Sequence, residues 1–160
     1  MSHYNITRRM KTPVSMAYST LNDSTVATNN PIPLNSITDL VGSTASSITI
    51  SGNAITLPSG YWWYVKGSPQ CYCDQGWIRY AWRDSTSNAQ YGRSGFLTVQ
   101  KTAWLFGGDE LATCLIDCTS SSITMKLNIE GFTLTSDIND SNTTHNYLSG
   151  RTRVLIWRLG

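Results

Sequence analysis

Apolar and polar residues alternate with a period of two along most of the chain, which is the pattern of strands that bury one face. The clearest case is 123–130, where Ile, Met, Leu and Ile alternate with Thr, Lys, Asn and Glu. No segment repeats its apolar residues at the period of 3.6 that an amphipathic helix requires. The pattern therefore predicts an all-β protein.

Turn signals between the apolar runs predict two hairpins. Residues 47–57 are expected to turn at Gly52-Asn53, a pair that tolerates positive φ. Residues 111–118 are expected to pair with 123–130 through the polar residues 119–122. Further strands are predicted at 61–66, 77–84, 96–99, 103–106, 132–138 and 152–159.

Three of these strands carry more specific expectations. The aromatic run 61–66 is expected to be central or beside a neighbouring subunit, because its side chains are too large to leave in solvent on both faces. In 77–84, Ile78, Tyr80 and Trp82 should share one face and Trp77, Arg79, Ala81 and Arg83 the other. The apolar final run 152–159 should lie inside a sheet. Eight to ten such strands predict a two-sheet antiparallel sandwich or jelly roll over residues 46–160.

The first 45 residues are predicted to form an extended N-terminal arm with one or two short strands, because prolines interrupt any longer element. Arg8, Arg9 and Lys11 give residues 1–22 a charge of +3, so the rest of the chain, whose total is +2, carries −1. A small basic arm is therefore expected to precede a nearly neutral body.

Composition excludes several classes of function. The 160 residues include 20 Ser and 20 Thr but only 14% charged residues, and a net charge of +2 is too small for nucleic-acid binding. No apolar run approaches the roughly 20 residues of a membrane-spanning helix. The first ten residues lack the hydrophobic core of a signal peptide, so synthesis in the cytoplasm without general export is expected.

Candidate chemical motifs favour structural interpretations. Residues 107–111, Gly-Gly-Asp-Glu-Leu, match a nucleotide-cyclase signature, but that chemistry needs an α/β scaffold, so we interpret them as a turn before a strand. Cys71 and Cys73 share one face of a strand, as do Cys114 and Cys118. Zinc binding and a disulfide remain open for these cysteines, beside reduced buried thiols, which the cytoplasm favours.

The acidic and histidine residues do not form a recognisable catalytic site. The loop 137–142 is rich in oxygen ligands but lacks the glycine and closing glutamate of a calcium-binding helix-loop-helix motif, so a solvated loop is expected over a weak calcium site. His3 and His145, the only histidines, lie beside no nucleophile in a known motif. We expect no enzyme activity, no metal and no cofactor.

The order of these features resembles a known family. The stretch 58–64 (Pro-Ser-Gly-Tyr-Trp-Trp-Tyr), the amphipathic strand 77–83, the turn 107–111 and the closing run 153–159 (Arg-Val-Leu-Ile-Trp-Arg-Leu) are similar to TNF/C1q-type jelly rolls. They resemble more closely the small virion structural proteins of tailed bacteriophages, particularly marine cyanophages. The resemblance implies a ten-strand jelly-roll domain that forms a homotrimer around an apolar axis. The candidates for the trimer interface or adjacent core are Tyr64, Tyr80, Trp82 and Trp157.

The resemblance also implies a function. The expected protein decorates, cements or forms a knob on a phage head, with Arg8, Arg9 and Lys11 in the arm docking on capsid or tail proteins. The alternative is a receptor-binding tail-fibre tip that recognises host surface glycan through the loops 85–93 and 139–146. The ligand-facing candidates are Trp62, Trp77, Trp104, Asp140 and His145. Both functions place the protein in the virion, without nucleic-acid binding or membrane insertion.

Overall fold

The computed structural model describes residues 15–18, 28–40, 47–69, 71–72, 75–99, 110–135, 147–148 and 152–159, and these form strands, turns and connections without a helix. The strands are β1 (Ser15–Tyr18), β2 (Ser36–Asp39), β3 (Thr49–Ser51), β4 (Ala54–Leu57), β5 (Trp62–Ser68), β6 (Cys71–Tyr72), β7 (Gln75–Asp84), β8 (Gln90–Val99), β9 (Ala112–Asp117), β10 (Ile123–Thr135), β11 (Tyr147–Leu148) and β12 (Arg153–Leu159). Every pair is antiparallel, so the predicted all-β class is confirmed.

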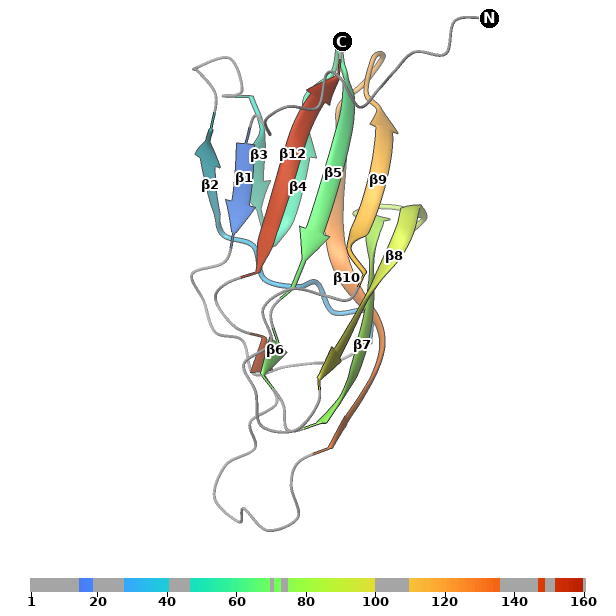
Figure 1. Cartoon of the computed structure of the whole chain (residues 1–160). Helices are drawn as coiled ribbons and strands as arrows, with labels where there is room; N and C mark the ends of the chain where they lie inside the picture. Colours follow the sequence, from blue (N-terminus) through green and yellow to red (C-terminus); the bar gives the residue numbers. More distant parts are fainter. Residues whose placement is uncertain are drawn as a thin grey trace, which may run out of the picture.

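Ten strands form one nearly closed sheet in the order β2-β1-β12-β5-β9-β8-β7-β10-β4-β3, and β6 pairs separately with β11. Figure 1 shows that the sheet folds back on itself. We call β2, β1, β12, β5 and β9 the front layer and β3, β4, β10, β7 and β8 the rear layer. The strands at the two ends of the sheet, β2 and β3, lie near each other.

The hydrophobic core fills the space between the layers. Its largest fully buried side chains include Trp63 of β5 and Tyr80 and Trp82 of β7. The Trp82 Nε1 donates a hydrogen bond of 3.1 Å across the layers to the carbonyl oxygen of Ala112. The Tyr80 hydroxyl likewise donates to the carbonyl oxygen of Glu110 at 2.8 Å. The polar atoms of these two rings are therefore satisfied inside the core, as burial requires.

The predicted hairpin and the two central strands are confirmed. β3 and β4 pair through Ile50 and Ile55, and Gly52 and Asn53 both have positive φ, of 55° and 63°, as a two-residue hairpin turn requires. β5 lies between β12 and β9, and β12 lies between β1 and β5. Their apolar sequences are explained by this central position.

The predicted pairing of 111–118 with 123–130 is wrong. β9 pairs with β5 in the front layer, whereas β10 pairs with β4 and β7 in the rear layer. Cys114 and Leu127 are both buried in the same core. The turn 119–122 therefore carries the chain from one layer to the other, because both strands bury a face against the core between them.

The structure also corrects the predicted boundaries of two strands and of one loop. The segments 123–130 and 132–138 were expected to be separate strands, but β10 runs through residue 135 with a shift in register between Ile129 and Gly131. The predicted loop 85–93 ends early, because β8 begins at Gln90. The Asp84 carboxylate accepts hydrogen bonds from the backbone amides of Thr86 and Ser87, which closes a short turn instead.

Part of the predicted N-terminal arm belongs to the body of the protein. β1 pairs with β12 and β2 in the main sheet. The segment after residue 28 runs beside β10, where the Ile32 amide donates to the Leu127 carbonyl oxygen at 2.7 Å. Ile32 and Leu34 are fully buried in the core. Prolines at 31 and 33 permit this extended path but obscured it in the sequence. Arg8, Arg9 and Lys11 lie outside the described residues.

Candidate functional site

A polar cluster on the outer face of the rear layer is built on two irregularities of the sheet. The first is the register shift in β10, where Glu130 lies between Ile129, paired with Tyr80, and Gly131, paired with Arg79. The second is in β8, where residues 92–94 lie opposite the single residue Ala81 of β7. Such bulges redirect side chains away from the regular alternation of a strand. Here they bring Glu130 and Ser94 together.

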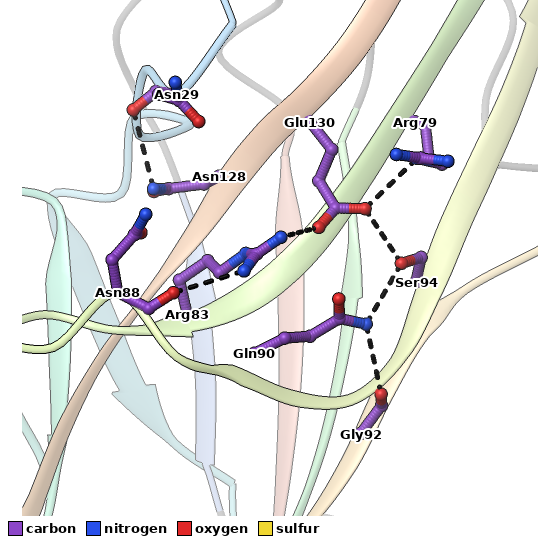
Figure 2. Close-up of polar contacts among 9 residues, drawn as sticks. All are labelled: Asn29, Arg79, Arg83, Asn88, Gln90, Gly92, Ser94, Asn128 and Glu130. Carbon is purple, nitrogen blue, oxygen red and sulfur yellow. Dashed lines mark hydrogen bonds and ion pairs between the residues drawn. The ribbon is translucent and has the colours of Figure 1, made fainter.

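Glu130 of β10 is the centre of this cluster, and Figure 2 shows its partners converging from β7 and β8. Its Oε2 lies 3.2 Å from the Arg79 Nε and accepts a hydrogen bond of 2.9 Å from the Ser94 hydroxyl. Its Oε1 pairs with the Arg83 Nη2. Gln90 extends the cluster by donating from Nε2 to Ser94 Oγ at 3.2 Å. We call Arg79, Arg83, Gln90, Ser94 and Glu130 the Glu130 cluster.

Burial makes the cluster rigid. The Glu130 side chain is only 6% exposed, and both of its carboxylate oxygens are paired. A buried carboxylate is stable only with such partners. Arg83 is held on two sides and only 27% exposed, because its Nη1 also donates to the carbonyl oxygen of Asn88 at 3.2 Å. The Arg79 side chain remains 58% exposed. The cluster thus fixes one solvent-facing guanidinium.

A second polar group fixes the turn between β7 and β8. The Tyr91 hydroxyl donates to the Asp84 Oδ2 at 2.8 Å. Hydrogen bonds from the Ser87 amide and the Tyr91 hydroxyl lower the pKa of Asp84 from 3.8 to about 2. Burial and the bond to the ionised Asp84 raise the pKa of Tyr91 from 10.0 to about 12. Both shifts favour the ionised carboxylate and the neutral phenol, which are the forms that the hydrogen bond needs.

The Glu130 cluster offers binding groups and no nucleophile beside a free base. Both oxygens of its only carboxylate already have partners, so this group is not placed to act as a general base. Within the ranges that the structure describes, no three His, Cys, Asp or Glu residues gather as metal ligands would. The arrangement suits recognition of a ligand by a rigid surface.

The outer face of the front layer carries large apolar side chains, in contrast to the Glu130 cluster. Trp62 and Leu115 are 40% and 50% exposed. Tyr64 and Trp157 pack against each other at 5.5 Å between ring centroids, and the Lys66 Nζ lies 5.7 Å from the Trp157 centroid. These side chains alternate with buried neighbours such as Val65, Ile116 and Ile156, so they share the outer face. We call Trp62, Tyr64, Leu115, Leu155 and Trp157 the aromatic face.

The structure separates the predicted interface candidates into two groups. Tyr80 and Trp82 are fully buried between the layers, so they belong to the core of one chain and not to a surface. Tyr64 and Trp157 lie on the aromatic face. The sequence pattern did not distinguish the groups, because a strand that is apolar on both faces gives no sign of which face meets the core.

The predicted ligand-facing residues do not gather at one place among the described residues. Trp62 is exposed on the front layer, whereas Trp77 of β7 stacks on Phe96 of β8 in the rear layer, with ring centroids 5.7 Å apart. Trp104, Asp140 and His145 lie outside the described residues, as does the loop 139–146.

Two of the four cysteines can be placed. Cys114 and Cys118 are free thiols that are buried in the core, as expected from their even spacing on one face. Burial raises the pKa of Cys114 from 9.0 to about 12, so the thiol stays neutral. The side chains of Cys71 and Cys73 lie outside the description.

Sequence reasoning missed Glu130, Ser94 and Gln90 as members of a site. The signal for Glu130 was its place at the end of an alternating run, just before Gly131. A glycine inside a strand pattern often marks a bulge. Arg79 and Arg83 were placed on the outer face, but nothing in the sequence located their shared partner 47 residues beyond Arg83.

Comparisons with known proteins leave this chain without an assigned family, because no family model and no curated protein matches its sequence. The described residues also include no helix of the length and apolarity that crossing a membrane would take. The two outer faces are therefore the features from which a function can be inferred.

Proposed function

We propose that this chain is a structural protein of a phage virion and acts as a homotrimer of TNF/C1q-type jelly rolls. The observed strand order supports the proposal. Five strands in the order β2-β1-β12-β5-β9 lie opposite five in the order β3-β4-β10-β7-β8, with layer crossings between consecutive strands. Crossings of this kind, such as the one from β9 to β10, are what a double Greek key requires.

The aromatic face is the single observation that carries the trimer. The core inside one chain is already complete, with Trp63, Tyr80 and Trp82 buried. Trp62 and Leu115 nevertheless stay 40% and 50% exposed on one continuous face. Exposed apolar patches of this kind mark interaction sites. A second copy is the occupant that we propose for this face.

The charges on the same face are compatible with a copy of the chain. Lys66 and Arg153 lie on it together with Asp117, so both signs of charge are present and opposite charges of two copies can face each other.

The trimer is tested by molar mass in solution, measured by light scattering. The wild-type chain, 17.7 kDa, should scatter as a trimer. Leu115→Glu should give a folded monomer, because it places a charge at the centre of the apolar contact while leaving the core untouched. Lys126→Glu, on the outer face of the rear layer, is the matched control and should stay trimeric. A monomeric wild-type chain would overturn the proposal.

The virion role is tested separately. We propose that Arg8, Arg9 and Lys11 dock the trimer on a capsid or tail protein. Replacing all three by Ala leaves β1, which begins at Ser15, and should give a trimer that no longer joins particles. Deleting residues 1–22 would be a poorer test, because it also removes β1 from the main sheet. Undiminished incorporation of the triple variant would exclude docking by these residues.

A further inference from the structure

We infer that the outer face of the rear layer binds an acidic sugar, with Trp77 as the stacking platform and Arg79 as the carboxylate ligand. This site goes beyond the proposed assembly role, and it lies on the layer opposite the aromatic face. The site is built from contacts within one chain, so it is present whether or not the trimer forms.

An aromatic platform and a cation lie side by side on this face. Trp77 and Arg79 are alternate residues of β7, so their side chains leave the same side of the sheet. Phe96 of β8 is paired with Arg79 in the register and stacks against Trp77 at 5.7 Å, with 19° between the planes. Both rings are only partly buried. Aromatic surface of this kind suits the apolar C–H face of a pyranose ring.

The guanidinium of Arg79 is held ready for a ligand. Its Nε contacts Glu130 at 3.2 Å, and Glu130 is fixed in turn by Arg83 and Ser94. Glu130 engages the Nε of this guanidinium, and 58% of the Arg79 side chain is exposed to solvent. A planar guanidinium binds a carboxylate through two parallel hydrogen bonds.

The glycine beside Arg79 lets the Trp77 ring lie close to the sheet. Gly131 is the residue of β10 that pairs with Arg79, so no side chain rises at that position. A Cβ placed at Gly131 would meet the Trp77 ring at 3.5 Å, which shows that the ring edge lies next to this position. Trp77 and Arg79 thus lie side by side, with the ring over Gly131 and the cation at its border.

The charge of the site selects the ligand class. Arg83 is turned toward Glu130, so Arg79 is the solvent-facing cation of the Glu130 cluster. One exposed cation, beside the buried carboxylate of Glu130, suits a ligand that carries a single carboxylate group. A nucleic-acid strand requires a row of cations along its phosphates. A uronic acid joins one carboxylate to a ring with an apolar face, which is the combination that the platform matches.

Titration calorimetry of the full chain tests the inference, with tetragalacturonic acid as the probe and its methyl ester as the uncharged counterpart. We expect the acid to bind and the ester to bind about tenfold more weakly, because charge-assisted hydrogen bonds to Arg79 are lost. Equal affinity for the acid and the ester would overturn recognition of the carboxylate. No saturable binding of the acid, or tighter binding of single-stranded DNA, would overturn the site.

Variants locate the binding. Arg79→Ala and Trp77→Ala should each weaken binding of the acid by about tenfold. Arg93→Ala, which removes another exposed arginine of a carboxylate pair, is the matched control and should bind as the wild type does. If Trp77→Ala does not fold, Arg79→Lys keeps the experiment decisive, because it retains the charge and loses the paired hydrogen bonds. Unchanged affinity in Arg79→Ala would exclude the site.

Discussion

Gly95 marks a close approach between the layers at the scale of single residues. A Cβ at this position would lie 2.5 Å from both the Tyr80 Cζ and the Ala112 nitrogen. The ring of Tyr80 has no room to retreat, because its hydroxyl is bonded to the Glu110 carbonyl oxygen and its side chain is fully buried. The absence of a side chain at Gly95 therefore lets β8 lie close to both Tyr80 of β7 and Ala112 of β9.

We predict that Gly95→Ala destabilises the fold by about 3 kcal/mol or more, because the added methyl group overpacks a region that cannot relax. The free energy of unfolding in urea measures the effect. Gly131→Ala is the matched control, since its Cβ would meet the Trp77 ring at an ordinary 3.5 Å. Equal losses in the two variants would contradict the close approach as the cause.

Tyr91 gives a prediction on pH dependence. Burial and the hydrogen bond to Asp84 raise its pKa in the folded chain from the ordinary 10.0 to about 12. Between these values the unfolded chain loses the phenolic proton and the folded chain keeps it, so stability falls as pH rises through this window. Absorbance titration should find a tyrosine that ionises near pH 12. In Tyr91→Phe this late transition should vanish; its persistence would show that another tyrosine is responsible.

Several residues could be assigned to a face from the sequence, but not to a partner. Ile78, Tyr80 and Trp82 were placed correctly on the inner face of β7. Ala81 was placed on the outer face and is nevertheless fully buried, which the alternation did not indicate. A period of two fixes the side of a sheet on which a residue lies, while its exposure depends on neighbours that are distant in sequence.

At the scale of elements, the bulge in β8 explains how the two layers form one continuous sheet. Residues 92–94 lie opposite Ala81, and within this stretch Arg93 pairs with Thr113 of β9. β8 therefore leaves the rear layer and reaches the front one at its bulge. The same irregularity positions Ser94 beside Glu130. One departure from regular pairing thus serves both the closure of the sheet and the polar cluster.

We predict that Glu130→Gln destabilises the fold by about 1–3 kcal/mol, since it leaves Arg79 and Arg83 near each other without a buried counter-charge. Glu110→Gln is the comparison, because its ion pair with Arg93 is exposed and should contribute less than about 1 kcal/mol. Urea denaturation of both variants gives the difference. A larger loss in Glu110→Gln would exclude Glu130 as the anchor of the outer face.

Strand existence was easier to predict than strand pairing. The hairpin at Gly52-Asn53 was predictable because a two-residue turn with positive φ fixes both strands locally. The partner of β9 was not, because β5 is about 50 residues earlier in the chain. The Glu130 cluster depends on three strands and two bulges, so its geometry was beyond the sequence pattern even where its residues were on the expected face.

At the scale of the whole molecule, the two outer faces differ in chemistry. The front layer presents Trp62, Tyr64 and Leu115, whereas the rear layer presents Arg79, Arg83 and Lys126 beside the stacked pair Trp77 and Phe96. A single chain in water gains nothing from leaving Trp62 and Leu115 exposed on the front layer. The asymmetry is explained if the front layer is covered in an assembly while the rear layer stays in solvent, where the proposed sugar site needs it.

This division predicts how the proposed trimer responds to salt. The aromatic face contributes mostly apolar contact, and the charges of Lys66, Arg153 and Asp117 lie around it. In about 1 M sodium chloride the screening length falls to about 3 Å, so charge pairs weaken while burial of Trp62 and Leu115 does not. Light scattering should therefore report an unchanged trimer mass at this salt concentration. Dissociation there would mean that the charged residues hold the copies together, and that the exposed rings of the front layer have another purpose.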